Sequence, residues 1–264
     1  MLAVKDICKS FGGIRALNGV SLQVQKGSIV GLIGPNGSGK TTLFNIISGF
    51  CSADSGEIHF KGEKISGLPP FETAKKGLVR TFQVSKAPKR MTVLENMLLA
   101  CSGQIGENVL GGLFKRKQIL GQEKDHLKKA LSLLELTGLS HLANEYSGNL
   151  SGGQQKLLSL ARILIRNPDL VLLDEPTAGV NLTLTKKFME FIKELQVKQG
   201  KSFFLVEHNM NLISSICDKV YVLDVGDKIA EGTPEQIQKD ERVLEVYLGA
   251  RRREKENKRG VSGK

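Results

Sequence analysis

The sequence predicts an α/β fold in which the strands of a largely parallel, mixed sheet alternate with helices. Three observations support this prediction. Short apolar runs bounded by glycine alternate with segments of helical spacing at both ends of the 264-residue chain. The run at 170–173 is continuously apolar, as expected of a buried strand. The middle of the chain has helical spacing only, which predicts a helical lobe inserted into the sheet domain.

The individual elements follow from the same patterns. Residues up to 85 predict strands at 2–7, 20–25, 29–33, 57–60 and 78–82, and a helix at 40–48 that ends at Gly49. Helical spacing predicts lobe helices at 91–100, 118–137 and 139–145, with a glycine-rich connection at 103–112. After residue 150 we expect helices at 153–166, 182–198 and 209–216 and strands at 170–173, 202–206, 220–223 and 228–231.

These elements predict a single domain, residues 1–250, followed by a tail at 251–264. Residues 1–84 and 150–250 are expected to form the core, and residues 85–149 the helical subdomain. The tail has seven basic and two acidic residues and a single aliphatic one, Val261. Since so little apolar surface cannot offset the entropy lost on ordering, we expect the tail to be disordered.

The net charge of +11 is concentrated in two places. One is the tail, and the other is the segment 86–129, which holds nine basic and four acidic residues. Such charge suits an anionic membrane surface or, equally, a solvated face that aids solubility. The chain has no tryptophan and only 5% aromatic residues, which argues against a nucleic-acid surface built on base stacking.

Export and membrane insertion are not expected. The apolar runs are too short to cross a bilayer, and the first ten residues lack the apolar region of a signal peptide. The four cysteines are scattered without a CxxC pair, which is typical of free thiols in a reducing compartment. We therefore expect a soluble cytosolic protein.

The clearest motif is G-x-x-x-x-G-K-[ST], formed by Gly34, Pro35, Asn36, Gly37, Ser38, Gly39, Lys40 and Thr41. It follows an apolar strand and opens a helix that continues with Thr42, the context of a phosphate-binding loop. The glycines let backbone N–H groups surround a phosphate, and the helix N-terminus adds positive potential. Lys40 can reach the terminal phosphates, and Thr41 can ligate Mg²⁺. The alternative is a glycine-rich turn with an incidental lysine, a chance match expected in about one chain in a hundred.

Asp174 and Glu175 follow the apolar strand at 170–173. Ligands of open α/β sheets bind at the carboxyl ends of the strands. At that edge Asp174 can hold Mg²⁺ through its water shell, and Glu175 can orient and deprotonate an attacking water. The alternative is an acidic pair solvated in a turn, and the presence of the phosphate loop favours the functional interpretation.

Two further polar residues follow predicted strands. His208 comes after the strand at 202–206, and Gln83 comes after the strand at 78–82. His208 can hydrogen-bond a γ-phosphate or the attacking water, and the Gln83 amide can ligate Mg²⁺ or the same water. The alternatives are a structural histidine and an exposed glutamine without a role.

The segment 150–155, LSGGQQ, is not needed by a generic phosphate-loop enzyme. Alone it also fits a serine helix cap followed by flexible glycines. With the phosphate loop before it, and a helix, the apolar strand and Asp174-Glu175 after it, the chain resembles the ABC transporter ATPases over about residues 2–250. The resemblance implies a P-loop NTPase (RecA-like) core, an N-terminal antiparallel β-subdomain and an inserted α-helical subdomain. It also implies ATP and Mg²⁺ as cofactors and ATP hydrolysis coupled to transport.

The resemblance assigns roles to single residues. It implies that Gln83 is the Q-loop glutamine, that His208 is the switch histidine and that Phe11 stacks on adenine. The alternative for Phe11 is packing beneath the turn that follows it. Many members carry Asp where this chain has Asn181. An acid role at that position is therefore in doubt, although Asn181 can still hydrogen-bond across an interface.

The resemblance also implies that two ATPase chains meet head to tail. Each chain would then cap the γ-phosphate bound by its partner with the signature residues Ser151, Gly152, Gly153 and Gln154. The second chain is either another copy or a related ATPase.

Several segments point to one subgroup. TFQ at 81–83, AGVN at 178–181, EHNM at 207–210 and VYLG at 246–249 resemble the branched-chain amino acid import ATPases. This resemblance implies import of branched-chain amino acids or a similar polar solute. The implied partners are integral membrane subunits and, indirectly, a solute-binding protein, with no nucleic acid. The ATPase would lie on the cytoplasmic face of the cell membrane, and its segment 83–95 and lobe would receive a short helix from a membrane subunit.

Three alternatives are weighed against this function. A lipopolysaccharide-export ATPase shares several of these segments but usually has a shorter lobe. A non-transport ABC ATPase acting on DNA or the ribosome often carries a coiled-coil insertion or a second cassette, and this chain has neither. A GTPase or kinase would leave LSGGQ unexplained, and the guanine-specific N-K-x-D segment is missing. The transported substrate is determined by other subunits and cannot be identified from this chain.

Overall fold

The computed structural model describes residues 1–81, 87–101 and 116–248, of which 116 and 117 are described by their backbone only. The chain forms two compact units. The first contains Met1–Arg80, Asp169–Pro176 and the chain from Lys193 on, and the second contains Thr81–Pro168 and Thr177–Ile192. The assignment of residues 1–84 and 150–250 to a catalytic core stays a prediction.

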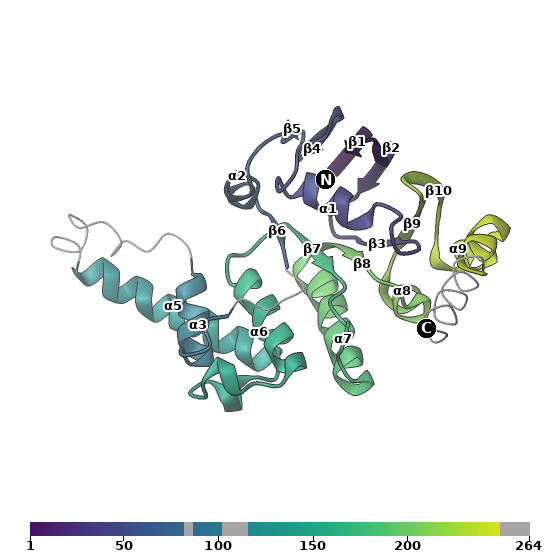
Figure 1. Ribbon diagram of the computed structural model, residues 1–264. Coiled ribbons are helices and arrows are strands. Elements are labelled where there is room, and N and C mark those ends of the chain that lie inside the picture. Colours follow the sequence, from purple (N-terminus) through teal and green to yellow (C-terminus); the bar gives the residue numbers. More distant parts are fainter. Residues whose placement is uncertain (82–86, 102–115, 249–264) are drawn as a thin grey trace, which may run out of the picture. The chain divides into compact units, whose positions relative to one another are not determined.

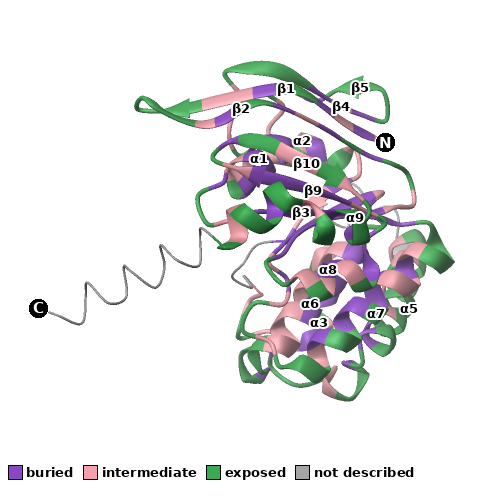
Figure 2. Ribbon diagram, turned by 90° about the vertical axis from the view of Figure 1, so that its right-hand side faces the viewer, coloured by how far each residue is buried: buried purple, intermediate pink, exposed green. Residues whose placement is uncertain are grey.

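The first unit is built on a six-stranded sheet with the strand order β10-β9-β3-β8-β7-β6 (Figure 1). Its strands are β3 (Ile29–Ile33), β6 (Leu78–Arg80), β7 (Leu170–Asp174), β8 (Ser202–Val206), β9 (Lys219–Asp224) and β10 (Asp227–Gly232). Neighbouring strands pair in parallel, except that β10 is antiparallel to β9. All residues of β3, β7 and β8 are buried, as Figure 2 shows for β3. Burial explains why the three sequences are apolar apart from Asp174, which ends β7, and Ser202, which begins β8.

A second, four-stranded sheet of this unit has the order β2-β1-β4-β5. It contains β1 (Leu2–Phe11), β2 (Ile14–Val24), β4 (Ser55–Phe60) and β5 (Glu63–Lys64). All its pairings are antiparallel, and Gly12 and Gly13 turn β1 into β2 with positive φ angles of 50° and 89°. Its apolar face joins the six-stranded sheet and α1 in one hydrophobic core.

The helices of the first unit are short. They are α1 (Lys40–Ile47), α2 (Pro70–Lys75), α8 (Met210–Ile216) and α9 (Pro234–Lys239), and residues 241–248 are also helical. The α1 helix begins at Lys40, within the phosphate-loop motif, and buries Leu43 and Phe44 completely. It therefore anchors that loop in the core.

The second unit is helical. It contains α3 (Val93–Ala100), α5 (Arg116–Leu136), α6 (Gly152–Leu164) and the first part of α7 (Leu182–Gln199), with single 3₁₀ turns at Ser140–Leu142 and Ser147–Asn149. The α3 helix contacts both α5 and α6. A capping box starts α3, because the Thr92 hydroxyl accepts from the Glu95 N–H while the Glu95 carboxylate accepts from the Thr92 N–H.

The predicted helix at 139–145 is wrong. Only Ser140–Leu142 forms a 3₁₀ turn, and the chain then runs alongside the start of α3. The carbonyls of Ala143 and Glu145 accept hydrogen bonds from the N–H groups of Leu94 and Val93. These carbonyls satisfy N–H groups of the first turn of α3, which have no partner inside that helix.

The predicted fold class is confirmed: the protein is α/β, with a mixed sheet, an N-terminal antiparallel sheet and a helical unit between strands. The predicted strand at 78–82 is formed as Leu78–Arg80, and Phe82 lies outside the described residues, as do the connection at 103–112 and the tail. Sequence patterns missed β5, α2, α9 and the helix at 241–248. Among the described residues, no helix combines the length and apolar character that a membrane span requires.

Candidate functional site

Three neighbouring strands of the six-stranded sheet end in the predicted polar residues. The phosphate-loop segment follows β3, His208 lies two residues after β8, and Asp174 is the last residue of β7. Since these strands are adjacent and parallel, their carboxyl ends lie at the same edge of the sheet. The predicted meeting of these residues at one edge is therefore present in the first unit.

The loop before α1 requires glycine at two positions. Gly34 has a φ of 151°, and a Cβ atom there would lie 2.1 Å from the carbonyl oxygen of Leu223. Gly39 has a φ of 101°, and its Cβ would lie 2.6 Å from the carbonyl oxygen of Ala16. Packing and backbone conformation thus both require glycine, as expected of a loop that closes around a phosphate.

Lys40 lies over this loop. Its ammonium donates hydrogen bonds to the carbonyls of Gly34 (2.9 Å) and Pro35 (2.7 Å) and to the Ser38 hydroxyl (3.3 Å). Burial lowers the pKa of Lys40, and the carboxylates of Glu175 and Asp174 act in the opposite direction. The ammonium is therefore partly desolvated, bonded to the loop and subject to the field of the two carboxylates, and a phosphate bound in the loop would meet its positive charge.

Glu175 and His208 form a pair. The Nε2 atom of His208 lies 2.7 Å from Oε1 of Glu175, and the two side chains are 41% and 27% exposed. Glu175 has a φ of 46°, the left-handed region that non-glycine residues rarely adopt and that typically costs about 1–3 kcal/mol. Such strain is concentrated at functional sites. The pair combines a partly accessible carboxylate with a side chain that orients it, which is the arrangement of a general base.

Asp174 is buried and meets a residue that the sequence analysis did not identify. One carboxylate oxygen, Oδ2, accepts a hydrogen bond of 2.7 Å from Nη2 of Arg80, at the end of β6. The other oxygen, Oδ1, is buried without a hydrogen-bond partner among the described residues. Arg80 could have been found from its position, because it is a basic residue at the end of a short apolar strand of the sheet that carries the other site residues.

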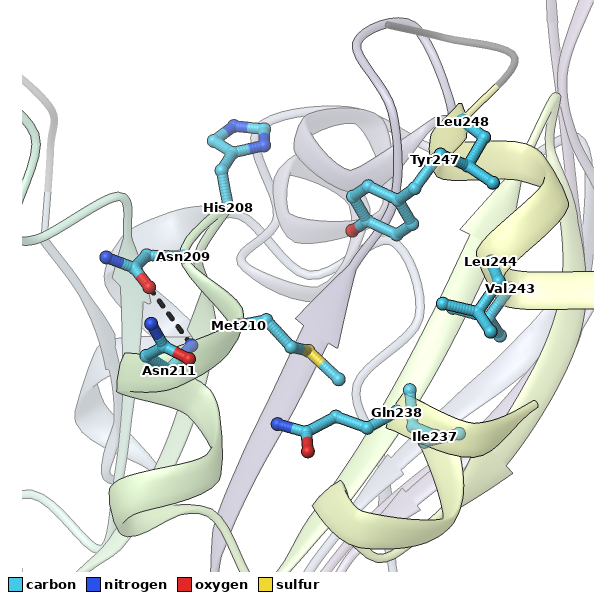
Figure 3. A pocket seen from close by; sticks show the side chains of 10 residues that line it. All are labelled: His208, Asn209, Met210, Asn211, Ile237, Gln238, Val243, Leu244, Tyr247 and Leu248. Atoms are coloured by element: carbon cyan, nitrogen blue, oxygen red, sulfur yellow. Dashed lines mark hydrogen bonds between the residues drawn. The ribbon is translucent and has the colours of Figure 1, made fainter. Parts of the chain in front are cut away.

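A cavity of about 530 Å³ adjoins His208 (Figure 3). The start of α8 lines one side, where Asn209 caps the helix by accepting from the Asn211 N–H at 3.0 Å. The residues at 237–248 line the other side, and among them Tyr247 reaches back to the backbone of Gly34. Burial raises the pKa of Tyr247 to about 12, against which that hydrogen bond acts. The C-terminal segment thus contacts the start of the phosphate loop.

The signature residues start α6 in the second unit. Ser151 is the N-cap, and its hydroxyl and the Gln154 side chain form a capping box. Ser151 and Gly152 are exposed, so the N-terminus of this 13-residue helix is accessible. A Cβ atom on Gly153 would lie 2.2 Å from Cδ2 of Leu184, so a larger residue there would require the Leu184 side chain to move.

The segment around Asn181 is bonded to residues of α6 and α7 in the second unit. The Asn181 side-chain oxygen accepts from the N–H of Leu184 at 2.9 Å and so caps the start of α7. Lys156, on α6, donates to the carbonyl of Ala178. These contacts fix the signature helix to this segment.

Phe11, another predicted site residue, is largely exposed in the first unit. Phe11 is 51% exposed at the end of β1, with the Lys9 ammonium 5.3 Å from its ring centre. Its ring is therefore not packed in the core. Gln83 lies outside the described residues.

A phosphate loop after one strand of a buried parallel sheet, with a carboxylate pair at the same edge of the sheet two strands away, defines a P-loop nucleoside triphosphatase. Comparisons with known proteins specify the class further. The sequence model of the ABC transporter family matches residues 17–178, and that of the branched-chain amino acid ATP-binding cassette transporter matches residues 228–252. The chain belongs to the ABC transporter family, as an ATP-hydrolysing subunit.

Individual relatives agree with this assignment. The chain is 44% identical to the probable branched-chain amino acid transport ATP-binding protein LivG of Archaeoglobus fulgidus, covering 95% of this chain and 96% of the relative. It is similar to the ADP conformation of an ATP-binding cassette of an ABC transporter, with 40% identity, a TM-score of 0.81 and coverage of 94% and 98%. A dimeric post-hydrolysis cassette bound to ADP and Pi is 28% identical, with a TM-score of 0.72 and coverage of 89% and 99%.

Proposed function

We propose that this ATPase powers the import of branched-chain amino acids or a similar polar solute. The proposal is supported by the names of its relatives and by the match of residues 228–252 to the branched-chain cassette family. The observation that carries the proposed chemistry is the convergence of Lys40, Asp174 and the Glu175–His208 pair at the carboxyl edge of one sheet.

In the proposed site the loop at 34–42 surrounds the β- and γ-phosphates of ATP. The loop N–H groups and the N-terminus of α1 supply fixed positive potential, and Lys40 exchanges its bonds to the loop carbonyls for phosphate oxygens. The ring of Phe11 is exposed enough to stack on adenine. Gln83 is proposed to join this site from the segment outside the described residues.

The same edge suits Mg²⁺. The Oδ1 atom of Asp174 is a buried anionic oxygen without a hydrogen-bond partner in the described part of the chain, as expected of an atom that serves a metal or its water shell. Asp174, Thr41 and the Gln83 amide would hold the ion. When bound, Mg²⁺ would neutralise charge that develops on the β- and γ-phosphates.

Glu175 is the proposed general base. Its carboxylate would orient the attacking water and accept its proton, and His208 would hold the carboxylate in place through the 2.7 Å contact. The strained backbone of Glu175 fixes where the side chain starts, so that little reorganisation is needed at the moment of reaction.

The exposed start of α6 suits a role in a dimer of ATPase chains. A helix N-terminus binds anions, and Ser151 and Gly152 are accessible to a partner chain. We propose that they, with Gly153 and Gln154, cap the γ-phosphate bound by a second copy or a related ATPase. The dimeric relative bound to ADP and Pi supports the pairing of two ATPase chains.

The helical unit offers a docking surface for integral membrane subunits. A groove of about 590 Å³ runs between α3 and α5, lined by Met91, Leu98, Leu99, Leu120 and Leu127 together with charged residues. Leu99 and Leu120 are 54% and 58% exposed. We propose that this groove receives a short helix of a membrane subunit, which would hold the ATPase at the cytoplasmic face of the membrane. The solute-binding protein would then act through the membrane subunits.

The test is co-purification of the chain with its membrane subunits, followed by ATPase assays with a panel of solutes. Stimulation by branched-chain amino acids that requires the solute-binding protein is the expected result. Charge-introducing Leu99→Glu should reduce co-purification, whereas Leu244→Glu, a similarly exposed leucine outside the groove, should not. Stimulation by unrelated solutes alone would overturn the proposed substrate, and unchanged assembly of Leu99→Glu would overturn the docking site.

A further inference from the structure

The Arg80 guanidinium is buried beside the predicted metal carboxylate. The Arg80 side chain is 7% exposed and that of Asp174 is 3% exposed, and the pair is formed between Nη2 and Oδ2 at 2.7 Å. The separation of the two residues along the chain is 94 positions, so the pair exists only when β6 and β7 are paired. The pair lies directly at the proposed active site and has no role in the function proposed above.

Arg80 also contacts α1. Its Nη1 atom donates to Oδ1 of Asn45 at 2.6 Å and to the Ser48 hydroxyl at 3.2 Å, and the guanidinium lies 5.8 Å from the ring centre of Phe44. One planar group thus bonds the carboxylate at the end of β7 and two side chains of the helix that the phosphate loop opens. A guanidinium can do this because its donors point in fixed, diverging directions and its charge is permanent.

The contacts of Arg80 determine which atom of Asp174 is left for a metal. Arg80 engages Oδ2, and Oδ1 is the carboxylate atom without a hydrogen-bond partner in the described part of the chain. Thr41, the other proposed protein ligand of the first turn of α1, belongs to the helix that Arg80 contacts through Asn45 and Ser48. A group bonded to both β7 and α1 therefore constrains the two proposed metal ligands relative to each other.

We propose that Arg80 is a positioning residue for the Mg²⁺ site, holding Asp174 by one oxygen so that the other serves the metal. The inference rests on the proposed function, because it presupposes that Asp174 and Thr41 serve Mg²⁺. Residues that orient metal ligands in this way typically affect metal affinity by about 10- to 100-fold. Arg80 acts through Asp174 and need not touch the nucleotide.

The test uses ADP as the probe, so that hydrolysis does not intervene. The dissociation constant of ADP is measured by calorimetry in Mg²⁺ and in EDTA for the full chain. The constant in EDTA divided by the constant in Mg²⁺ is the ratio that reports how much the metal contributes to binding. In Arg80→Met the ratio is expected to fall about tenfold towards that of Asp174→Asn, while the affinity in EDTA stays within about twofold. Arg80→Lys, which keeps the charge but not the divergent donors, should give an intermediate ratio.

Two further variants separate positioning from folding. Asn45→Ala removes one bond from Arg80 to α1 but leaves the ion pair intact, and should lower the ratio several-fold even if Arg80→Met does not fold. Arg242→Met removes an exposed arginine that pairs with Asp240 at 3.6 Å, and should leave the ratio unchanged. Melting temperatures of all variants are recorded in parallel.

The outcomes are distinguishable. Unchanged ratios in the folded Arg80 and Asn45 variants, with only a lower melting temperature, would show a structural ion pair and overturn the inference alone. If the wild-type chain bound ADP equally in Mg²⁺ and EDTA, the proposed metal site would fail and the inference with it. A reduced ratio that Arg80→Lys partly restores would support the positioning role.

Discussion

Replacement of Glu175 by glutamine tests the proposed base most directly. Glutamine has the same shape, can keep the 2.7 Å hydrogen bond to His208, and is no worse suited than glutamate to the φ of 46°. We therefore expect the free energy of unfolding to change by less than about 0.5 kcal/mol. What is lost is the ability to accept a proton from the attacking water. General-base assistance is worth about 10²- to 10⁴-fold in rate, or about 3–5 kcal/mol in the barrier.

The assay is release of phosphate at saturating ATP and Mg²⁺, with ATP affinity measured separately. Glu175→Gln should bind ATP as tightly as the wild type, hydrolyse it at least a hundredfold more slowly, and elute as a persistent ATP-bound dimer in gel filtration. The matched control is Glu190→Gln, the same change at an exposed position of α7, which should hydrolyse ATP normally. A Glu175→Gln rate within about tenfold of the wild type would refute the assignment of Glu175 as the base.

Three further predictions concern the loop and its surroundings. Lys40→Ala should weaken ATP binding at least tenfold in equilibrium titrations, since it removes the ammonium over the loop, and unchanged affinity would contradict the phosphate-loop assignment. Gly39→Ala should lower the free energy of unfolding, measured in urea, by about 2–5 kcal/mol, because its Cβ would lie 2.6 Å from the Ala16 carbonyl oxygen. The control Gly12→Ala, which has open space around its Cβ, should lower the free energy of unfolding by only about 1–2 kcal/mol. Equal losses in the two variants would rule out the close contact as the cause. The pKa of Tyr247 is about 12 in the folded chain and about 10 in the unfolded chain. Between these pH values the unfolded chain loses the proton first, so the free energy of unfolding should fall by at most about 2–3 kcal/mol as the pH rises from 10 to 12. Tyr247→Phe should remove this part of the alkaline loss together with the latest step of the tyrosinate absorbance titration, and an unaltered titration would exclude Tyr247 as its origin.

The elements that the sequence predicts best are the most buried ones. The predicted bounds of β3 and β8 agree with the structure to the residue, since burial leaves a nearly continuous apolar run, which only Ser202 at the start of β8 interrupts. Strands β1 and β2 were predicted too short because their far ends are exposed and mix polar with apolar residues, so that no clear alternation marks them. The segment at 139–145 was misassigned because its apolar spacing fits a helix, whereas its carbonyls bond to the start of α3, which no local pattern records.

In the candidate site, the identities of most residues could be predicted from the sequence, but their contacts could not. The loop, Asp174, Glu175 and His208 were predictable because each has a characteristic residue type directly after a strand. Their mutual contacts were not, since Glu175 and His208 are separated by 33 positions and their 2.7 Å contact depends on β7 pairing with β8. Arg80 was missed for a related reason. A single arginine at a strand end suggests an exposed side chain, and its burial follows only from partners contributed by α1 and β7.

The position of β3 in the sheet has a consequence for biosynthesis. Its two neighbours, β8 and β9, come late in the chain. In the folded chain the turn before β3 also depends on β8, because the Gly27 N–H donates a hydrogen bond to the Ser202 hydroxyl, 175 positions further on. A ribosome therefore completes the phosphate loop long before either flanking strand exists. Until then the apolar segment Ile29–Ile33 has no sheet to join, and it must be kept from aggregating. Because the proposed phosphate-binding edge includes the end of β8, ATP can stabilise the fold only after the chain has been synthesised beyond residue 206.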